Sequence, residues 1–260
     1  MLIDTHCHLT DPALANQHAL VLARAAQAGV RRMVTVATSP PDWDAASAMV
    51  AASDALYMAA GLHPHKAGQM APGIMERLEA VLAASKVVAV GETGLEYHYD
   101  FSPRDKQREA FAAQLQLARR LAKPVIVHSR ESMADTLAIL DEHAMANQRL
   151  VFHCFTGTPA EAEQILQRGW YISLAGVVTF KNAGQLQEAA RLVPSDRLLF
   201  ETDSPYLTPE PLRRVRPNEP AYIAHTARFL ADLRGVAFEE FAAACWRNAQ
   251  RFFGPDPPAA

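Results

Sequence analysis

The sequence predicts a protein of the α/β class folded as a single (β/α)8 TIM barrel, and three observations support this prediction. Eight short aliphatic or aromatic runs, each bounded by turn-forming residues, recur along the chain. Longer stretches with helical spacing separate these runs. Near-continuous apolar strands that alternate with helices indicate a parallel sheet covered on both faces, and 260 residues suit eight such units. A doubly wound open sheet is the competing fold.

The expected strands and helices alternate from one end of the chain to the other. Aliphatic runs predict strands at 2–3, 33–37, 56–60, 87–90, 125–127, 150–152, 171–174 and 198–200. Helical spacing predicts helices at 19–28, 42–52, 72–84, 104–121, 134–143, 159–167, 182–192, 219–233 and 238–252. Gly29 follows the first helix, and Pro72 and Pro159 begin two others, as helix boundaries require.

The chain shows no linker, repeat or low-complexity segment that would divide it. We therefore expect one barrel domain over residues 1–253 and a short Pro-rich tail over residues 254–260. The long irregular segment from Asp203 to Pro220 contains five prolines, and loops of this length in compact domains are usually functional or disordered.

The composition is that of an ordinary globular protein, with 50% hydrophobic and 20% charged residues. A net charge of −3 argues against bulk attraction to nucleic acid, so a polyanion would have to be held at a local site. Three cysteines form no disulfide framework, and Met1 to Ile3 leave no room for a secretory signal before Asp4. No stretch is long and apolar enough to span a bilayer, and we expect a cytoplasmic monomer.

Metal-binding side chains stand where the predicted strands end. The first strand leads into His6 and His8, which are two residues apart and therefore face the same side of a strand. Four more such residues follow later strands: Glu92, His128, His153 and Asp203. The carboxyl ends of all strands in a parallel barrel lie on one face, so these side chains are expected to converge. One such residue alone would be unremarkable, but structural histidines have no reason to select the same end of several strands.

The predicted ligand set indicates which metals suit the site. Four imidazoles and two carboxylates suit zinc, manganese, iron or nickel, whereas magnesium prefers ligands richer in oxygen. Six ligand groups exceed what one catalytic ion needs, so we expect two divalent ions per chain, about 3.5 to 4 Å apart. We expect each ion to be zinc, manganese or magnesium, and these three are the ions to test.

The strand order suggests a role for each ligand. Glu92, near the middle of this order, is expected to bridge the two ions. Asp203 is expected to bind the first ion together with the histidines of the first strand, and to accept a proton from water. His128 and His153 complete the ligands of the second ion. Metal binding lowers the pKa of water toward about 7, which supplies a nucleophile near neutral pH.

Seven motifs, spread in order over nearly the whole chain, resemble the successive motifs of the TatD family of metal-dependent hydrolases. They lie at 4–8 (DTHCH), 61–65 (GLHPH), 91–97 (GETGLEY), 124–130 (PVIVHSR), 153–157 (HCFTG), 179–182 (TFKN) and 201–207 (ETDSPYL). The resemblance implies a TIM barrel related to the amidohydrolase superfamily, a divalent-metal centre, and deoxyribonuclease activity, often as a 3′–5′ exonuclease on single-stranded DNA. Glu96 departs from the family, which commonly has aspartate there, but this leaves the metal ligands unchanged.

Carried over position by position, the metal ligands of the family fall on the six residues that the strand ends select: His6, His8, Glu92, His128, His153 and Asp203. The expected reaction is attack of activated water on a phosphodiester of single-stranded DNA, with Asp203 and Glu92 as the catalytic residues. His63 and His65, just past the third strand, and Arg130 are expected to meet the phosphate or the leaving group.

The sequence leaves the roles of two further groups open. Tyr97, Tyr99 and Phe101 follow the Glu92 motif, where they either stack unpaired bases or pack under a loop. The arginines of the long loop either follow a nucleic-acid backbone or are simply solvated; they are Arg213, Arg214 and Arg216.

Two other classes of function stay open at this point. An amidohydrolase or esterase acting on a small molecule would use the same kind of metal centre. A lysine at the bridging strand end would favour that class, but here Glu92 occupies the position, and Lys86 and Lys123 precede their strands. A metal-stabilised binding protein without turnover is the second alternative, and it would require a closed, water-free site.

Overall fold

The computed structural model describes residues 1–254 of the chain. These residues form two compact units, of which the first joins Met1–Thr35 to the described residues from His153 onward and the second is Val36–Phe152. The predicted Pro-rich tail, residues 254–260, lies outside the described residues except for Gly254, and a single barrel domain over 1–253 stays a prediction.

The strands follow one another through the sheet in chain order, from β1 to β8. At least one helix separates each strand from the next. The strand pairings within the units are parallel. This order and direction are those of a (β/α)8 barrel, in which functional side chains are carried at the carboxyl ends of the strands.

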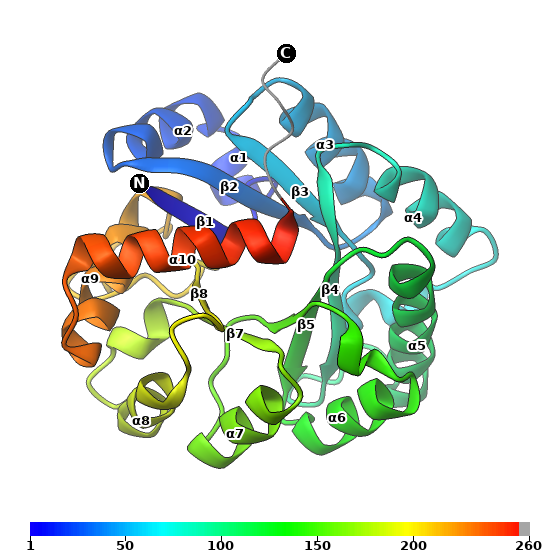
Figure 1. The fold of residues 1–260 in the computed structure, drawn as a ribbon. Helices are drawn as coiled ribbons and strands as arrows, with labels where there is room; N and C mark the ends of the chain where they lie inside the picture. Colours follow the sequence, from blue (N-terminus) through cyan, green and yellow to red (C-terminus); the bar gives the residue numbers. More distant parts are fainter. Residues whose placement is uncertain (255–260) are drawn as a thin grey trace. The chain divides into compact units, whose positions relative to one another are not determined.

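The first unit contains the strands and helices from both ends of the chain. Its strands are β1 (Leu2–Cys7), β7 (Tyr171–Leu174), β8 (Leu198–Phe200) and the first part of β2 (Val30–Ala37). Its helices are α1 (Pro12–Ala15), α2 (His18–Gln27), α7 (Pro159–Gln167), α8 (Gly184–Leu192), α9 (Ile223–Arg234) and α10 (Phe238–Phe253), with short 3-10 helices η3 (Gly176–Thr179) and η4 (Pro220–Tyr222). The α10 helix runs alongside β1 and β8 (Figure 1), where Phe241 packs on Phe200 with ring centroids 5.7 Å apart.

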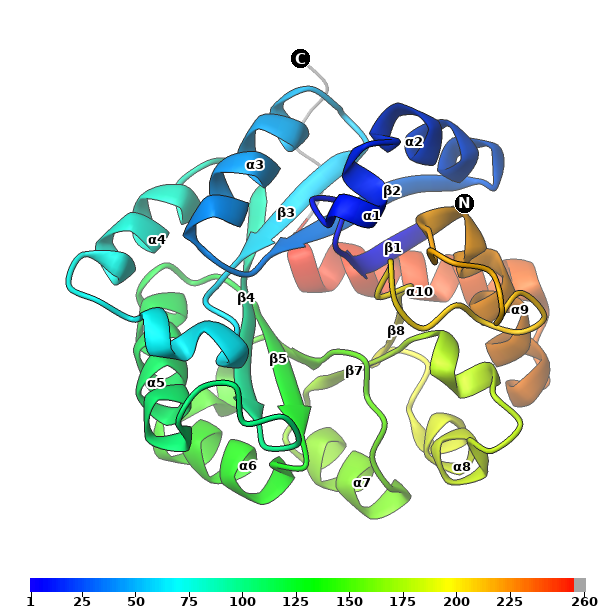
Figure 2. The same ribbon diagram turned by 180° about the vertical axis from the view of Figure 1, so that it is seen from behind.

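The second unit contains the middle of the chain. Its strands are β3 (Leu56–Ala60), β4 (Val87–Glu96), β5 (Val125–Arg130) and β6 (Leu150–Phe152). Its helices are α3 (Pro40–Ala51), α4 (Ile74–Leu82), α5 (Arg104–Arg120) and α6 (Met133–Glu142), with 3-10 helices η1 (Pro64–Gln69) and η2 (Met145–Asn147). Figure 2 shows α5 alongside β4, and the buried Gln114 of α5 donates hydrogen bonds to the Leu62 carbonyl and to Thr93 Oγ1.

The β4 strand is longer than the sequence predicts. The aliphatic run suggested residues 87–90, but β4 continues to Glu96 and therefore carries both Glu92 and Glu96. Gly91 and Gly94 permit this extension because each brings the backbone close to β5. In the same way β5 continues past its aliphatic run through His128 to Arg130.

Gly94 provides a direct test of this close approach. A Cβ atom at Gly94, whose φ is +142°, would lie 2.0 Å from the His128 carbonyl oxygen. We expect Gly94→Ala to lower the free energy of unfolding by about 3 kcal/mol or more, because the strand must move. Gly73→Ala is the matched control, since Gly73 also has a positive φ but its added Cβ meets nothing within 4 Å. Its cost should be about 1 kcal/mol in urea unfolding, and equal costs for the two variants would contradict the interpretation.

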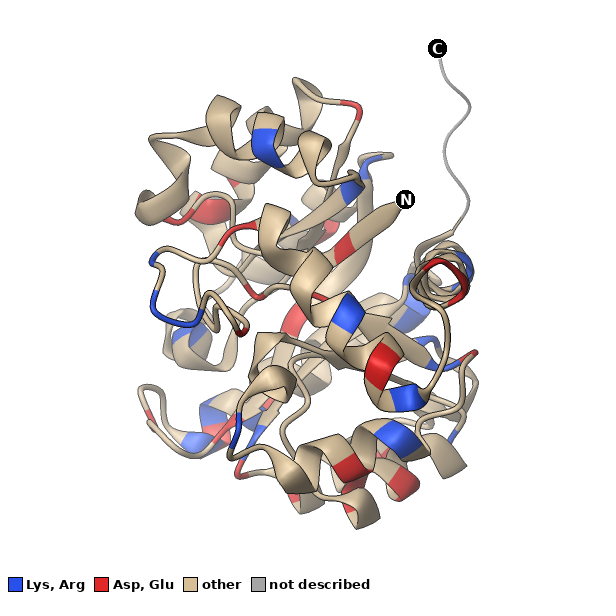
Figure 3. Cartoon of the chain, turned by 90° about the vertical axis from the view of Figure 1, so that its left-hand side faces the viewer, with Lys and Arg blue, Asp and Glu red and all other residues tan. Residues whose placement is uncertain are grey.

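Charged residues of both signs are mixed along the chain. Figure 3 shows Lys and Arg segments interspersed with Asp and Glu segments on the helices in view, which accords with the net charge of −3. Within residues 1–254, no helix has the length and hydropathy needed to cross a membrane.

Candidate metal centre

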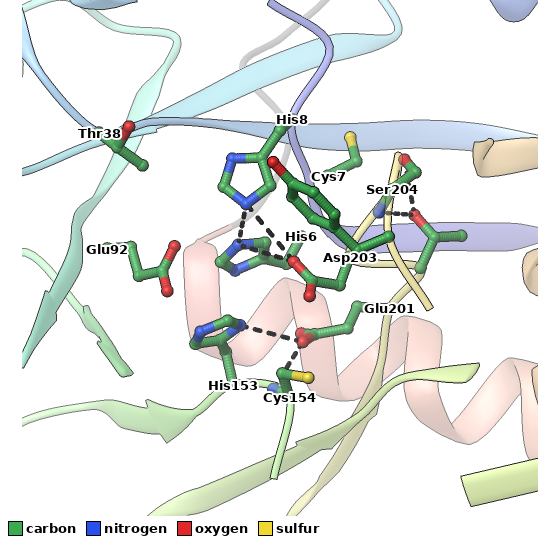
Figure 4. Close-up of polar contacts among 12 residues, drawn as sticks. His6, Cys7, His8, Thr38, Glu92, His153, Cys154, Glu201, Asp203 and Ser204 are labelled. Atoms are coloured by element: carbon green, nitrogen blue, oxygen red, sulfur yellow. Dashed lines mark hydrogen bonds and ion pairs between the residues drawn. The ribbon is translucent and has the colours of Figure 1, made fainter. Parts of the chain in front are cut away.

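His6, His8 and Asp203 bring three potential metal-binding atoms together in the first unit (Figure 4). The Nε2 atoms of His6 and His8 are 3.2 Å apart. Asp203 Oδ1 lies 3.4 Å from His8 Nε2 and 3.8 Å from His6 Nε2. His6 is fully buried at the end of β1, whereas His8 and Asp203 remain partly accessible.

These spacings suit a divalent cation. Ligand atoms about 2.0–2.1 Å from one tetrahedral zinc lie about 3.4 Å from each other, close to the separations among these three side chains. Imidazole nitrogen and carboxylate oxygen are also the donors that zinc and manganese accept. The first cluster therefore fits a metal ion both in its donor chemistry and in its spacing.

The backbone after β8 holds Asp203 beside β1. The Asp203 amide donates to the His6 carbonyl at 3.0 Å, and the His8 amide donates to the Ser204 carbonyl at 2.7 Å. Asp203 itself has a φ of +52°, an uncommon conformation for a non-glycine residue that is often found at functional sites. Asp4 adds a further link, because its buried carboxylate accepts hydrogen bonds from the Thr202 amide and hydroxyl.

Burial and hydrogen bonding act in opposite directions on the two aspartates. Burial alone would raise the pKa of Asp203, but its hydrogen bond with His8 and the charges of His6, His8 and His153 hold that pKa below its usual value. Asp203 is therefore ionised near neutral pH, as a metal ligand must be. Burial dominates at Asp4 and raises its pKa to about 7.

His153 joins the first cluster from the end of β6. Its ring stacks on that of His6 with centroids 4.0 Å apart and planes 10° from parallel. Its Nδ1 lies 3.2 Å from Glu201 Oε1 (Figure 4). Glu201 also accepts hydrogen bonds from the Cys154 amide at 2.6 Å and from Ser173 Oγ at 2.5 Å. A carboxylate at Nδ1 fixes the tautomer of His153 and leaves Nε2 to bind a metal.

Glu201 would therefore influence a bound metal through His153, and we expect Glu201→Gln to lower divalent-metal affinity by about 10- to 100-fold. The glutamine keeps the shape of the side chain but loses the charge that orients the imidazole and raises its basicity. Isothermal titration of the metal-stripped protein measures the effect. Glu163→Gln, at an exposed position of α7, is the matched control. Unchanged affinity in Glu201→Gln would show that Glu201 does not orient a ligand.

A second cluster lies within the second unit and consists of His63, Glu92 and His128. Glu92 Oε1 is 2.6 Å from His128 Nδ1 and 3.2 Å from His63 Nε2. Glu96 Oε2 approaches the other ring nitrogen of His128 at 3.1 Å and lies 3.7 Å from His65 Nε2. Two buried carboxylates from β4 thus face three histidines, which is again a donor set that divalent metals accept.

The pKa shifts in the second cluster favour metal binding. Burial lowers the pKa of His63 to about 4, against the opposing charge of Glu92, so His63 is neutral near pH 7 and can act as a ligand. Burial opposes ionisation of Glu96, but hydrogen bonds from His128 and from the His98 and Tyr99 amides lower its pKa to about 2. Neither His63 nor Glu96 would therefore have to lose a proton before it could hold a metal.

The predicted substrate-binding residues divide between the cluster and its rim. His63 and His65 belong to the surroundings of Glu92 and Glu96. Arg130 is exposed at the end of β5, and its guanidinium carbon lies 4.9 Å from the centre of the Tyr99 ring. Glu131, the residue after Arg130, pairs with His98, and its Oε1 lies 2.6 Å from His98 Nδ1.

The arginines of the long loop make local contacts. Arg213 stacks on Phe180 with its guanidinium carbon 4.0 Å from the ring centre. Arg216 donates to Thr208 Oγ1 at 3.0 Å. These contacts help to shape the loop, whose base is held where the buried Asn218 donates to the Thr202 and Tyr206 carbonyls.

The structure thus brings His6, His8, His153 and Asp203 together in the first unit. It pairs Glu92 with His128 in the second unit. Sequence reasoning did not assign roles to Glu96 and Glu201. Both lie within motifs that already contain a predicted ligand, four residues after Glu92 and two residues before Asp203. The even spacing of each glutamate from a predicted ligand was the sequence signal for a role at the site. Whether each side chain points toward the ligands depends on the backbone conformation.

Comparisons with known proteins agree over nearly the whole chain. A family model described as TatD related DNase matches residues 3–254. The Escherichia coli (strain K12) protein named "Uncharacterized metal-dependent hydrolase YcfH" is 43% identical over 258 residues, which cover 98% of this chain and 96% of that protein. The Citrobacter rodentium "3'-5' ssDNA/RNA exonuclease TatD" is 36% identical over 257 residues, which cover 97% and 98% of the two chains.

A solved structure extends this agreement to three dimensions. YJJV, described as a TatD homologue from Escherichia coli K12, superposes with a TM-score of 0.91 at 32% identity and covers 97% of each chain. The likeness confirms the predicted (β/α)8 barrel.

Proposed function

This chain belongs to the TatD family of metal-dependent hydrolases, and on that premise we propose that it hydrolyses phosphodiester bonds of single-stranded DNA as a 3′–5′ exonuclease. The name of the Citrobacter rodentium relative, an exonuclease on single-stranded DNA and RNA, supports nucleic acid as the substrate class. A hydrolase acting on a small phosphoester, amide or ester is the alternative against which the proposal is tested.

The observation that carries the proposal is the convergence of His6, His8 and Asp203 from the ends of β1 and β8. Two imidazoles and an ionised carboxylate would hold a divalent ion, and three protein ligands are typical of catalytic rather than structural zinc sites. Such ions, when bound, polarise a phosphoryl group and acidify water. The partial accessibility of His8 and Asp203 allows a substrate to reach this cluster.

We assign the metal ligands to the six predicted residues: His6, His8, Glu92, His128, His153 and Asp203. Each of the two clusters would contribute to a site for one of two ions, and bridging by Glu92 stays a prediction. Near Glu92, His63 is neutral and Glu96 is ionised near pH 7, so neither side chain would have to lose a proton before a second ion is held there.

The residues of the chain have distinct tasks in this reaction. Asp203 orients the attacking water and accepts its proton, since its carboxylate is ionised and partly accessible. Glu92, between His63 and His128, holds both imidazoles in place. His63, His65 and Arg130 are assigned to the phosphate and the leaving group, for which Arg130 offers a planar, bidentate donor.

The experiment that tests the proposal follows degradation of single-stranded DNA by metal-stripped protein resupplied with Mg, Mn or Zn. A strand labelled at its 5′ end should shorten stepwise, whereas a strand labelled at its 3′ end should release its label first. A matched RNA strand and a small chromogenic phosphodiester complete the substrate set.

Two variants control for contamination and for loss of fold. Glu92→Ala should not cleave DNA with any ion, whereas Glu142→Ala, at an exposed position of α6, should cleave like the unmodified protein. If DNA and RNA stay intact with every ion while metal binds and the small ester is hydrolysed, the nuclease proposal is wrong. The protein is then a small-molecule hydrolase using the same centre.

A further inference from the structure

Two exposed aromatic side chains stand side by side after β4. Tyr99 and Phe101, here called the aromatic pair, stack with ring centroids 5.3 Å apart and planes 9° from parallel. Tyr99 is 49% exposed and Phe101 68% exposed. Among the large hydrophobic side chains of residues 1–254, only Met1 is more exposed than Phe101. Contiguous exposed apolar surface is one of the features of ligand-binding sites.

Tyr97 has a different role from the aromatic pair. Its hydroxyl donates to Asp135 at 2.7 Å and accepts from Arg108, and the guanidinium of Arg104 lies 4.1 Å from its ring centre. Tyr97 is therefore engaged in holding helices α5 and α6. The sequence left open whether these aromatic residues stack unpaired bases or pack within the protein. Tyr97 packs within the protein, whereas Tyr99 and Phe101 remain accessible.

The aromatic pair adjoins the second cluster through His65. The His65 ring meets Phe101 edge-on at 4.7 Å and Tyr99 at 5.9 Å. His65 Nε2 also lies 3.7 Å from Glu96 Oε2, which in turn lies 3.1 Å from His128 Nε2. A single side chain thus separates the pair from the Glu96–His128 contact, so a substrate group lying on the pair is next to the proposed ligand His128.

The segment that carries the pair is held in place before any ligand arrives. Ser102 Oγ donates to the His65 carbonyl at 2.9 Å and accepts from the Gly68 amide at 3.1 Å. The buried Gln107 donates to the carbonyls of Glu96 and Ser102 at 3.0 and 2.9 Å. A preformed surface loses little conformational entropy on binding.

We infer that Tyr99 and Phe101 form a stacking subsite for an unpaired nucleobase of the substrate strand, next to the phosphodiester that is cleaved. This inference rests on the proposed nuclease function. A base has a flat π-face that can stack on the exposed Phe101 ring of the pair, and stacking on aromatic side chains is tolerant of sequence. A base in a duplex has both faces covered by its neighbours, so the subsite selects single-stranded substrates.

Arg130 gives the subsite a charge suited to the same ligand. Its guanidinium lies against the Tyr99 ring at 4.9 Å, a cation–π contact that fixes the charge at the edge of the pair. The side chain is exposed, so its N–H groups remain accessible to the phosphate attached to the stacked base.

The test compares a complete strand with one that carries abasic sites at its three 3′-terminal positions. Binding to the metal-loaded protein is measured by fluorescence anisotropy on strands with hydrolysis-resistant phosphorothioate linkages, and KM and kcat are measured on ordinary strands. Phe101→Ala should weaken binding of the complete strand about tenfold and raise KM with little change in kcat, because one base stack is lost. Binding of the abasic strand should be unchanged by this variant.

Three further variants test the role of the ring. Phe101→Trp should restore binding, Phe101→Leu should restore little of it, and Leu192→Ala, which truncates an exposed apolar side chain on α8, should have no effect. If Phe101→Ala weakens binding of the complete and abasic strands equally, or weakens neither, the proposed subsite is wrong. A protein that cleaves DNA but shows neither difference is a nuclease without this subsite. Conversely, base-dependent binding without cleavage of any strand would retain the subsite and reject the nuclease.

Discussion

Asp203→Asn should lower kcat/KM for metal-dependent hydrolysis by about 10³-fold while the protein stays folded. Asparagine keeps the size of the side chain but cannot accept the proton of the attacking water, and proton transfer by a positioned group contributes about 10²- to 10⁴-fold. It also removes the negative charge 3.4 Å from His8 Nε2 and 3.8 Å from His6 Nε2. Metal affinity of the first cluster should therefore fall as well, which isothermal titration measures alongside the kinetics.

Assays at two metal concentrations distinguish the loss of a proton acceptor in Asp203→Asn from the loss of metal affinity. If Asp203→Asn is assayed at metal concentrations that restore full occupancy, the remaining deficit in kcat measures the contribution of Asp203 as a base. Asp196→Asn, which changes an exposed aspartate in the same unit, should behave like the unmodified protein. Near-normal kcat at full occupancy would show that another group accepts the proton.

His128→Ala should abolish detectable hydrolysis while the metal-free protein still folds, although the loss of this imidazole from between two buried carboxylates lowers the free energy of unfolding. His128 lies between Glu92 and Glu96, at 2.6 and 3.1 Å, so its loss removes the imidazole shared by both carboxylates. Residues at the carboxyl ends of barrel strands serve function more than core stability. When stabilisation of the transition-state charge is lost at one such site, kcat falls by about 10²- to 10³-fold or more.

The measurements are urea unfolding of the metal-free protein and the metal-dependent assay described above. His143→Ala, which changes the residue at the C-cap of α6, is the control within the same unit. Full activity in His128→Ala would remove His128 from the site. A large loss of stability with partial activity would instead assign it a structural role.

Much of the fold was accessible from local sequence patterns. All eight strands lie where short aliphatic runs predicted them, because apolar residues bounded by turn residues are buried in this sheet. The main error concerned β4, whose aliphatic run ends at Val90 although the strand continues to Glu96. Gly91 and Gly94 interrupt the aliphatic pattern but allow the strand to pack closely against β5. The expectations of a cytoplasmic location and a monomer stay predictions.

For the site, too, the sequence predicted part of the arrangement and the structure revealed the rest. The sequence by itself determined the ligand types, since imidazoles and carboxylates recur at strand ends in an order that resembles the TatD family, and membership of that family is confirmed. It did not reveal that Glu201 holds His153 or that Glu96 faces His128.

Tertiary structure also decided that Tyr97 is engaged with two helices while Phe101 remains exposed. Burial, hydrogen-bond partners and the resulting pKa shifts depend on backbone segments far apart in the chain, such as β1 and the residues after β8. Local periodicity reports only which side of one strand a residue faces. It contains no information about which side chain of another strand stands opposite.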